Sequence, residues 1–199
     1  MTKAILMVLG SYLVGGIPFG LIVSFALTGE DPRKVGSGNI GATNVSRAAG
    51  KKAGVITLVL DALKGLLPVL LARHLFDTPH VVALVGLAAL CGHCFSPYLK
   101  LKGGKGVATG AGAFLGIAPL ALVLSLAVFV VMLKWKGYVS LSSLSAAWTM
   151  PLFILLLKGP PVIAMAAAAM AAIITLRHKA NIERLIAGEE PTFWKREER

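Results

Sequence analysis

The chain has 199 residues, of which 56% are hydrophobic and 15% are charged, and its mean hydropathy is +0.79. A soluble domain of this length cannot bury so much apolar surface, so the composition excludes an ordinary water-soluble globule and predicts a membrane protein. The net charge is +11, with 20 Lys and Arg against 9 Asp and Glu, which indicates anionic partners such as lipid headgroups or phosphorylated substrates.

Nearly uncharged stretches divide the chain into predicted membrane helices. Each is close to or above the ~20 residues that a helix needs to cross the hydrocarbon core. They fall at 4–27, 53–76, 81–99, 106–133, 137–157 and 159–176. The first is longer than the apolar region of a signal peptide and has no evident A-x-A cleavage site, so we expect it to be retained as a span.

The connections between these stretches alternate in charge, which predicts the orientation of the chain. Lys and Arg gather in four of them, and 16 of the 20 lie at 28–52, 100–105, 134–136 and 177–199. The positive-inside rule therefore places these four segments in the cytoplasm and the N-terminus outside. Two segments on the same side must be separated by an even number of crossings, yet only three apolar stretches lie between the second basic segment and the last.

The stretch 106–133 can supply the missing crossing. It contains a helix-breaking signal at Gly116–Pro119. As one straight helix it would be about 42 Å long, which exceeds a hydrocarbon core of about 30 Å. Two short or re-entrant helices within 106–133 restore the even number. The sequence thus predicts an all-α integral membrane protein of seven transmembrane helices, with its C-terminus in the cytoplasm and a single transmembrane domain over 1–199.

The first basic segment contains a loop dense in small hydrogen-bond donors, GSGNIGATNVSR over residues 36–47. Glycines let backbone N–H groups converge on an anion, short polar side chains add donors, and an arginine supplies a fork that fits phosphate. We predict a phosphate-binding loop whose candidate residues are Ser37, Gly38, Asn39, Gly41, Thr43, Asn44 and Arg47. The alternative is a polar turn without a ligand. The loop is not a nucleotide P-loop, because the Walker pattern does not occur in the sequence.

The second basic segment, LKLKGGKGVATG over residues 99–110, again combines glycines with lysines. The start of a helix exposes unpaired N–H groups and a positive dipole end, so it attracts anions. We therefore predict a second phosphate-binding loop from Gly103, Gly104, Lys105 and Gly106.

A third polar element, RHKANIERLIAGEE over residues 177–190, follows the last span. If the helix continues, the polar residues of this element lie on neighbouring turns; they are Arg177, His178, Asn181 and Arg184. Glu183 stands among basic neighbours, so we expect it to hold a cationic side chain in place rather than to meet an anionic substrate.

Several residues inside the predicted spans need an explanation. Asp61 and Lys64 are three apart and can pair with each other, or alternatively orient a substrate-binding loop. Cys91 and Cys94 form a C-x-x-C, but no thioredoxin-like βαβ pattern surrounds it, so we expect two buried packing residues. His93 is expected to brace the following loop, and no cluster has convincing metal-ligand spacing.

The three motifs, in this order, resemble those of the bacterial membrane acyl-phosphate:glycerol-3-phosphate acyltransferases. The resemblance rests on GSGNIGATNVSR, GHCFSPYLKLKGGKGVAT and HKANIERLIAGEE, and the length and span pattern extend it over nearly the whole chain. It implies that an acyl chain moves from acyl phosphate to the 1-hydroxyl of sn-glycerol 3-phosphate, giving 1-acyl-glycerol 3-phosphate (lysophosphatidic acid) and phosphate in phospholipid synthesis. It also implies an active site on the cytoplasmic face of the inner membrane, with no cofactor and neither CoA nor acyl carrier protein as donor.

The resemblance implies that the first motif is a phosphate-binding motif, that Gly103–Gly106 form the glycine-rich loop of the second, and that His178 and Asn181 of the third bind substrate. For the mechanism we add a hypothesis. Lys105 and Arg47 would neutralise charge on the carbonyl oxygen and the leaving phosphate. The proton of the attacking hydroxyl would pass to His178, with Glu183 as a weaker candidate, or to the donor's own phosphate, and we expect the phosphate, with His178 as a binding residue. The expected partners are glycerol 3-phosphate, acyl phosphate and membrane lipid, without nucleic acid, and the protein is expected to be a monomer.

Two other functions compete with this one. A transporter of phosphorylated metabolites would also carry broken helices and basic, glycine-rich loops, but its binding charges should lie near the midplane rather than at one face. A quinone-linked thiol oxidoreductase would depend on Cys91 and Cys94 alone. Replacing both cysteines with serine would abolish that activity and leave acyl transfer nearly intact.

Overall fold

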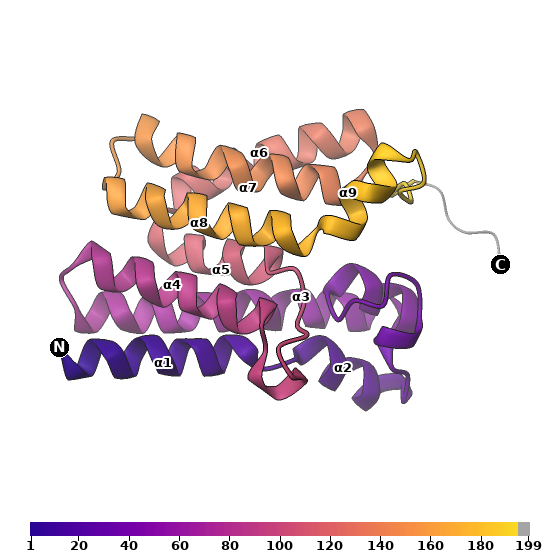
Figure 1. Cartoon of the computed structure of the whole chain (residues 1–199), viewed down its shortest axis with the longest axis horizontal. Coiled ribbons are helices and arrows are strands. Elements are labelled where there is room, and N and C mark those ends of the chain that lie inside the picture. Colours follow the sequence, from indigo (N-terminus) through magenta and orange to yellow (C-terminus); the bar gives the residue numbers. More distant parts are fainter. Residues whose placement is uncertain (195–199) are drawn as a thin grey trace. The chain divides into compact units, whose positions relative to one another are not determined.

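The computed structural model describes residues 1–194, and every regular element in this range is a helix, which confirms the all-α class. Two short 3-10 turns, η1 (Pro32–Lys34) and η2 (Pro97–Leu99), lie in the connections. The α-helices are α1 (Thr2–Gly16), α2 (Phe19–Thr28), α3 (Ala42–Leu75), α4 (Pro79–Cys94), α5 (Val107–Ile117), α6 (Pro119–Lys136), α7 (Val139–Leu156), α8 (Pro161–Arg177) and α9 (Lys179–Ile186) (Figure 1).

Within residues 1–194, five apolar helical segments are long enough to cross a membrane, and one of them joins α1 and α2 across their break. Five candidate spans are Thr2–Thr28, Ala42–Leu75, Pro79–Leu99, Pro119–Lys136 and Val139–Leu156. The bent pair α8 and α9 gives a sixth, and α5 is a shorter apolar helix of 11 residues. Large apolar side chains are exposed on the outer faces of the helices, as contact with lipid tails requires.

The break predicted within 106–133 is confirmed, because α5 ends at Ile117 and α6 begins at Pro119. A second break was not predicted. The stretch 4–27, predicted as a span, lies within one candidate span, Thr2–Thr28, but it holds two helices, because α1 ends at Gly16 and α2 begins at Phe19. Pro18 explains the difference, because proline lacks an N–H group and clashes with the preceding turn.

Helix α3 begins earlier than predicted, inside the basic segment. Its first turns cover Ala42–Ala49, and Gly50 then interrupts the helix with φ 87° and ψ 166° before the apolar part begins. Val45 and Ala53, on either side of this kink, pack with Val23 of α2 into one buried cluster. The second half of the first motif is therefore helical and fixed against α2.

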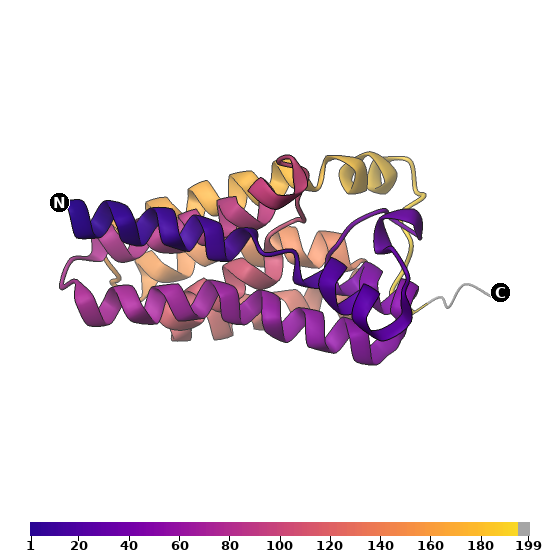
Figure 2. The same cartoon turned by 90° about the horizontal axis from the view of Figure 1, so that it is seen from below.

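The chain divides into two compact units, an N-terminal unit, Met1–Ile117, and a C-terminal unit that begins at Ala118. In the N-terminal unit α1 packs along α4, and the long α3 lies beside α1 (Figure 2). The α1–α4 contact is very close, since a Cβ added to Gly92 would lie 2.0 Å from the carbonyl oxygen of Tyr12. Small residues permit this approach, as in many membrane bundles.

The short helix α5 runs in the same direction as α3 and packs tightly on it. Gly65 of α3 lies against Thr109 near the start of α5, and Val69 lies against Gly116 near its end. Arg73 donates a hydrogen bond of 2.5 Å from Nη1 to the carbonyl oxygen of Gly116. The end of α5 thus lies near the end of α3, and its start lies near the middle of α3.

In the C-terminal unit α6 packs on α7 and α7 on α8 (Figure 1). The last helix turns away, because α8 and α9 meet at His178 with a bend of 64°. The helix therefore does not continue straight through the third motif. The segment after α9 returns to the α6–α7 turn, where the N–H of Phe193 donates to the carbonyl oxygen of Gly137 at 2.7 Å.

Candidate active site

The loop of the first motif is organised by the side chain of Asn44. Asn44 is buried, and its Oδ1 accepts the backbone N–H of Ser37 at 3.0 Å. Its Nδ2 donates to the carbonyl oxygens of Pro32 at 2.6 Å and Asn39 at 2.8 Å. Both amide hydrogens are thereby used within the protein. Asn44 shapes the loop, so its contribution to binding is indirect.

We expect Asn44→Asp to destabilise the N-terminal unit by about 2 kcal/mol, because carboxylate oxygens would face two carbonyl oxygens in place of two N–H donors. Thermal unfolding of the purified protein in detergent measures this. Asn39→Asp is the matched control, since Asn39 Oδ1 accepts the N–H of Gly41 at 2.8 Å and aspartate keeps that acceptor. Equal melting temperatures for Asn44→Asp and the wild type would contradict the prediction.

The other candidates of this motif surround Asn44. Ser37, Thr43 and Arg47 are exposed, Gly38 has φ 65°, and Gly41 is the residue before the first turn of α3. Exposed hydroxyls and a guanidinium at the start of a helix form an arrangement suited to an anion.

A neighbouring arginine, Arg33, is already paired. Its Nη2 lies 2.8 Å from Asp31 Oδ2 and its Nε lies 2.9 Å from Asp31 Oδ1. The hydrogen bond from the Arg33 side chain lowers the pKa of Asp31 to about 2, against the opposing effect of burial. The charge of Arg33 is thus balanced locally, which leaves Arg47 as the arginine of this loop best suited to an external phosphate.

The loop of the second motif packs on the end of α4. The N–H of Gly103 donates to the carbonyl oxygen of Cys94 at 3.2 Å, and the N–H of Gly104 donates to that of His93 at 3.0 Å. A Cβ on Gly103 would lie 2.0 Å from the His93 oxygen, and one on Gly104 would lie 2.1 Å from His93 Nε2. We predicted that these glycines expose N–H groups to an anion, but their N–H groups bind α4, and the glycines are needed for close packing.

Lys105 follows these two glycines and is partly exposed, just before α5 begins. Gly106 has φ 83°, and a Cβ there would lie 2.9 Å from Cys94 Sγ. Cys94 is fully buried and packs beneath this loop, whereas Cys91 is partly exposed. The left-handed backbone at Gly106 is what turns the chain from the loop into α5.

In the third motif, His178 is buried at the bend between α8 and α9. Its Nδ1 lies 2.8 Å from the carbonyl oxygen of Ile174. A carbonyl oxygen only accepts, so Nδ1 carries the hydrogen and a neutral ring has its lone pair on Nε2. This tautomer suits His178 to accept a hydrogen bond or a proton through Nε2.

Asn181 is held by a glutamate that sequence reasoning missed. Glu190 Oε1 accepts hydrogen bonds of 2.6 Å from both Asn181 Nδ2 and Ser140 Oγ, and Glu190 Oε2 accepts one of 2.8 Å from Arg184 Nε. We call these four residues the Glu190 cluster. It fixes the amide of Asn181 and ties the segment after α9 to the start of α7. The available signal was a carboxylate two residues after Gly188, in the same basic tail as Glu183.

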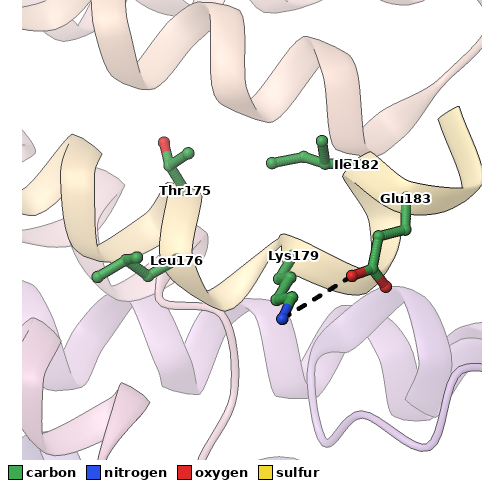
Figure 3. A pocket seen from close by; sticks show the side chains of 5 residues that line it. All are labelled: Thr175, Leu176, Lys179, Ile182 and Glu183. Carbon is green, nitrogen blue, oxygen red and sulfur yellow. Dashed lines mark ion pairs between the residues drawn. The ribbon is translucent and has the colours of Figure 1, made fainter. Parts of the chain in front are cut away.

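Burial alone would raise the pKa of Glu190, but the hydrogen bonds from Ser140, Asn181 and Arg184 more than offset it, so the pKa lies below its usual value. Glu190 is therefore a carboxylate at neutral pH. Glu183, in contrast, is exposed and lies 4.0 Å from Lys179 Nζ (Figure 3). Such an exposed pair contributes little to stability.

An apolar hollow of about 260 Å³ lies beside this pair, at the bend between α8 and α9. Figure 3 shows Leu176 and Lys179 on one side of it and Thr175, Ile182 and Glu183 around the rest. The hollow is lined by the residues that flank His178 and Asn181 in sequence, so an apolar surface adjoins the third motif.

The remaining predicted residues lie together inside the N-terminal unit. Asp61 Oδ1 and Lys64 Nζ form an ion pair of 2.8 Å, and His93 Nδ1 lies 3.7 Å from the same carboxylate oxygen. The first two motifs and these three side chains therefore belong to one unit, and the third motif belongs to the C-terminal unit.

Comparison with known proteins gives matches over nearly the whole chain. The sequence model of a family described as glycerol-3-phosphate acyltransferase matches residues 5–188. The chain is 50% identical to the glycerol-3-phosphate acyltransferase of Trichlorobacter lovleyi over 193 residues, covering 97% of this chain and 99% of the relative. It is 46% identical to that of Geobacter sulfurreducens, covering 92% and 94%.

The fold has matching crystal structures. The structure of PlsY, an integral membrane glycerol 3-phosphate acyltransferase, in its glycerol 3-phosphate form has a TM-score of 0.91 and 41% identity, covering 96% of both chains. The lysophosphatidic acid form has a TM-score of 0.89 and 40% identity, covering 96% of this chain and 95% of that one. These matches support acyl transfer rather than transport. With all three motifs inside a match of this extent, the chain belongs to the glycerol-3-phosphate acyltransferase family of integral membrane enzymes.

Proposed function

We propose that the protein transfers an acyl chain from acyl phosphate to the 1-hydroxyl of sn-glycerol 3-phosphate at the cytoplasmic face of the bacterial inner membrane, without CoA. The observation that carries the proposal is the 41% identity, over 96% of the chain, to a PlsY structure in its glycerol 3-phosphate form. The motif residues support it chemically. They are donors suited to phosphate, and an acyl phosphate is a mixed anhydride that needs no covalent intermediate on the enzyme.

In this reaction the hydroxyl oxygen of glycerol 3-phosphate forms a bond to the acyl carbon, and the bond from that carbon to the phosphate oxygen breaks. Lys105 and Arg47 neutralise the charge that develops on the carbonyl oxygen and on the leaving phosphate. Holding two charged substrates in place supplies a further part of the acceleration. The hydroxyl proton goes to the phosphate of the donor.

The substrates are held by residues of all three motifs. Exposed donors of the first loop, Lys105 of the second and the third-motif pair His178 and Asn181 bind them, while Asn44, Gly103 and Gly104 shape the loops that present these donors. The complete set of proposed binding and loop-forming residues is Ser37, Gly38, Asn39, Gly41, Thr43, Asn44, Arg47, Gly103, Gly104, Lys105, Gly106, His178 and Asn181.

The proposed topology has seven crossings, with the N-terminus outside and the C-terminus in the cytoplasm. The short helix α5 makes one of the seven crossings. The charge distribution of the connections supports it, since the basic segments lie on alternate sides of the spans. Reporter fusions at the C-terminus and within the turn between α3 and α4 should report opposite sides of the membrane.

We expect His178→Gln to retain more than about 1% of the wild-type kcat, because in the proposed reaction the hydroxyl proton goes to the donor phosphate and not to His178. Loss of a required general base would cost about 100-fold or more. The glutamine amide keeps a polar group at the bend but cannot take up a proton. Steady-state kinetics with both substrates measures this. A complete loss of turnover with unchanged affinity for both substrates would instead identify His178 as the proton acceptor.

The donor is tested by mixing the purified protein with palmitoyl phosphate and glycerol 3-phosphate, in the absence of metal and CoA. We expect one phosphate released for each glycerol 3-phosphate acylated, and no acylation when palmitoyl-CoA replaces palmitoyl phosphate. Omitting glycerol 3-phosphate controls for hydrolysis of the donor. Acylation from palmitoyl-CoA but not from palmitoyl phosphate would overturn the proposal.

A further inference from the structure

Three ionisable side chains form a buried cluster in the middle of the N-terminal unit. Asp61 and Lys64 lie one turn apart on α3, and His93 lies near the end of α4. Each of them is at most 4% exposed. Lys64 Nζ and His93 Nδ1 approach the same oxygen of Asp61, at 2.8 Å and 3.7 Å. Asp61 therefore joins two helices through one carboxylate.

The lysine of this cluster reaches the break between α1 and α2. Lys64 Nζ donates a hydrogen bond of 2.7 Å to the carbonyl oxygen of Ile17, which the break leaves without its usual helical partner. The same ammonium lies 5.7 Å from the centroid of the Phe19 ring, within the range of a cation–π contact. Lys64 thus fixes the start of α2, the helix that leads into the first motif.

The histidine of the cluster supports the loop of the second motif. The carbonyl oxygen of His93 accepts the N–H of Gly104. The His93 ring also lies close to Gly104, since a Cβ added to Gly104 would be 2.1 Å from His93 Nε2. A change in the position or tilt of this ring would displace Gly104 and with it the adjacent Lys105.

Stability alone does not account for these charges. Burying an ion pair costs desolvation energy that its attraction repays only in part, and an apolar pair of similar volume is often as stable or more so. Ionisable residues inside membrane spans are expensive and usually mark functional sites. Lys64 contacts the break that leads to the first motif, His93 contacts the loop of the second motif, and Asp61 links these two side chains.

We propose that Asp61, Lys64 and His93 are positioning residues. They hold the Gly103–Lys105 loop at a fixed position relative to the α1–α2 break, which places Lys105 correctly for the substrate phosphate. The proposal rests on the proposed function, in which Lys105 contacts a substrate. None of the three residues is assigned a contact with substrate.

The test is the double variant Asp61→Leu with Lys64→Met, which removes both charges while keeping similar volumes. We expect it to fold, with a melting temperature within a few degrees of the wild type. Hydrogen–deuterium exchange of the amides in residues 100–106 should become at least tenfold faster, and the KM for at least one of the two substrates should rise at least tenfold. A merely structural ion pair would leave both quantities unchanged in a folded variant.

Ser11→Ala is the matched control. Ser11 is a buried polar residue of the same unit, and its Oγ donates to the carbonyl oxygen of Val85 at 2.8 Å, which links α1 to α4 without reaching the loop. It should lower the melting temperature slightly and leave loop exchange and both KM values unchanged. If the double variant does not fold, His93→Gln, which retains the ion pair, takes its place with the same expected results.

Two outcomes would overturn the proposal: unchanged exchange in residues 100–106, or faster exchange with both KM values within twofold of the wild type. The exchange measurement needs no substrate. It therefore reports on the cluster even if acyl phosphate is not the donor, and failure of the wild-type protein to use palmitoyl phosphate would count against the proposed function alone.

Discussion

Replacing Gly103 by alanine is expected to reduce acyl transfer at least about a hundredfold. The added Cβ would lie 2.0 Å from the carbonyl oxygen of His93 and 2.9 Å from that of Cys94. Both atoms belong to the backbone of α4, which cannot move aside as a flexible side chain can, so the loop itself must shift. Overpacking of this kind costs about 1–3 kcal/mol. A displacement on the order of 1 Å at a residue that orients substrate accounts for the loss of rate.

The measurement is the rate of glycerol 3-phosphate acylation together with thermal unfolding, each compared with Gly10→Ala. Gly10 lies within α1, and no heavy atom beyond its own helix is found within 4 Å of the position of its Cβ. Alanine there should leave activity unchanged and stabilise the helix by about 0.5–1 kcal/mol. Wild-type activity in Gly103→Ala would show that the loop does not need its close contact with α4.

Replacing Glu190 by glutamine is expected to destabilise the C-terminal unit by about 2 kcal/mol and to abolish most of the activity. Three donors, from Ser140, Asn181 and Arg184, converge on this carboxylate. A glutamine has one acceptor oxygen and one NH₂ group, so in either orientation at least one donor of the cluster faces another donor. Asn181, a proposed substrate-binding residue, then loses the contact that fixes its amide.

The pH dependence of unfolding tests the same carboxylate. Its pKa in the folded protein lies below the usual 4.5, so its contribution to the free energy of unfolding is complete above that value and is lost as the pH falls through the lower folded-state pKa. The difference in stability between the wild type and Glu190→Gln should be constant from about pH 7 to pH 5 and shrink below about pH 4.5.

Glu189→Gln provides the control, because Glu189 is the neighbouring glutamate and is exposed. It should match the wild type in activity and in melting temperature at every pH. A stability difference between Glu190→Gln and the wild type that persists undiminished at acid pH would show that the ionised carboxylate is not the stabilising group.

Much of the helical framework could be predicted because the hydrocarbon core of a membrane does not solvate polar groups. Each span needs a long apolar run, and such runs are visible in the sequence without any knowledge of packing. The break before Pro119 was predictable from a Gly and a Pro in an overlong stretch. The break at Ile17–Pro18 carried a similar proline signal, but the stretch 4–27 has the length of one span, so nothing in the parity of the crossings required it.

The site was less predictable, because side-chain partners are set by tertiary contacts. Gly103 and Gly104 were predicted to expose N–H groups to an anion, whereas in the structure their N–H groups bind the end of α4 and the two glycines pack closely on it. Glu190 could not be distinguished from Glu183 or Glu189 by type or spacing, since one of its donors, Ser140, is 50 residues away in the chain, and the fold of the tail brings Asn181 and Arg184 to the same carboxylate. Asn44 likewise reads as a binding residue until its partners are known.

The short length of α5 bears on the environment in which a phosphate meets the second loop. Because α5 starts beside the middle of α3, the Gly103–Lys105 loop lies next to His93, whose ring approaches Asp61, and Asp61 is about 16 Å along α3 from its kink at Gly50. A phosphate bound there, as proposed, would exchange part of its hydration shell for protein dipoles and would be surrounded by a lower dielectric constant than water provides. The proposed attraction between Lys105 and that phosphate would be correspondingly stronger and less screened by salt than the same contact at the ends of the helices.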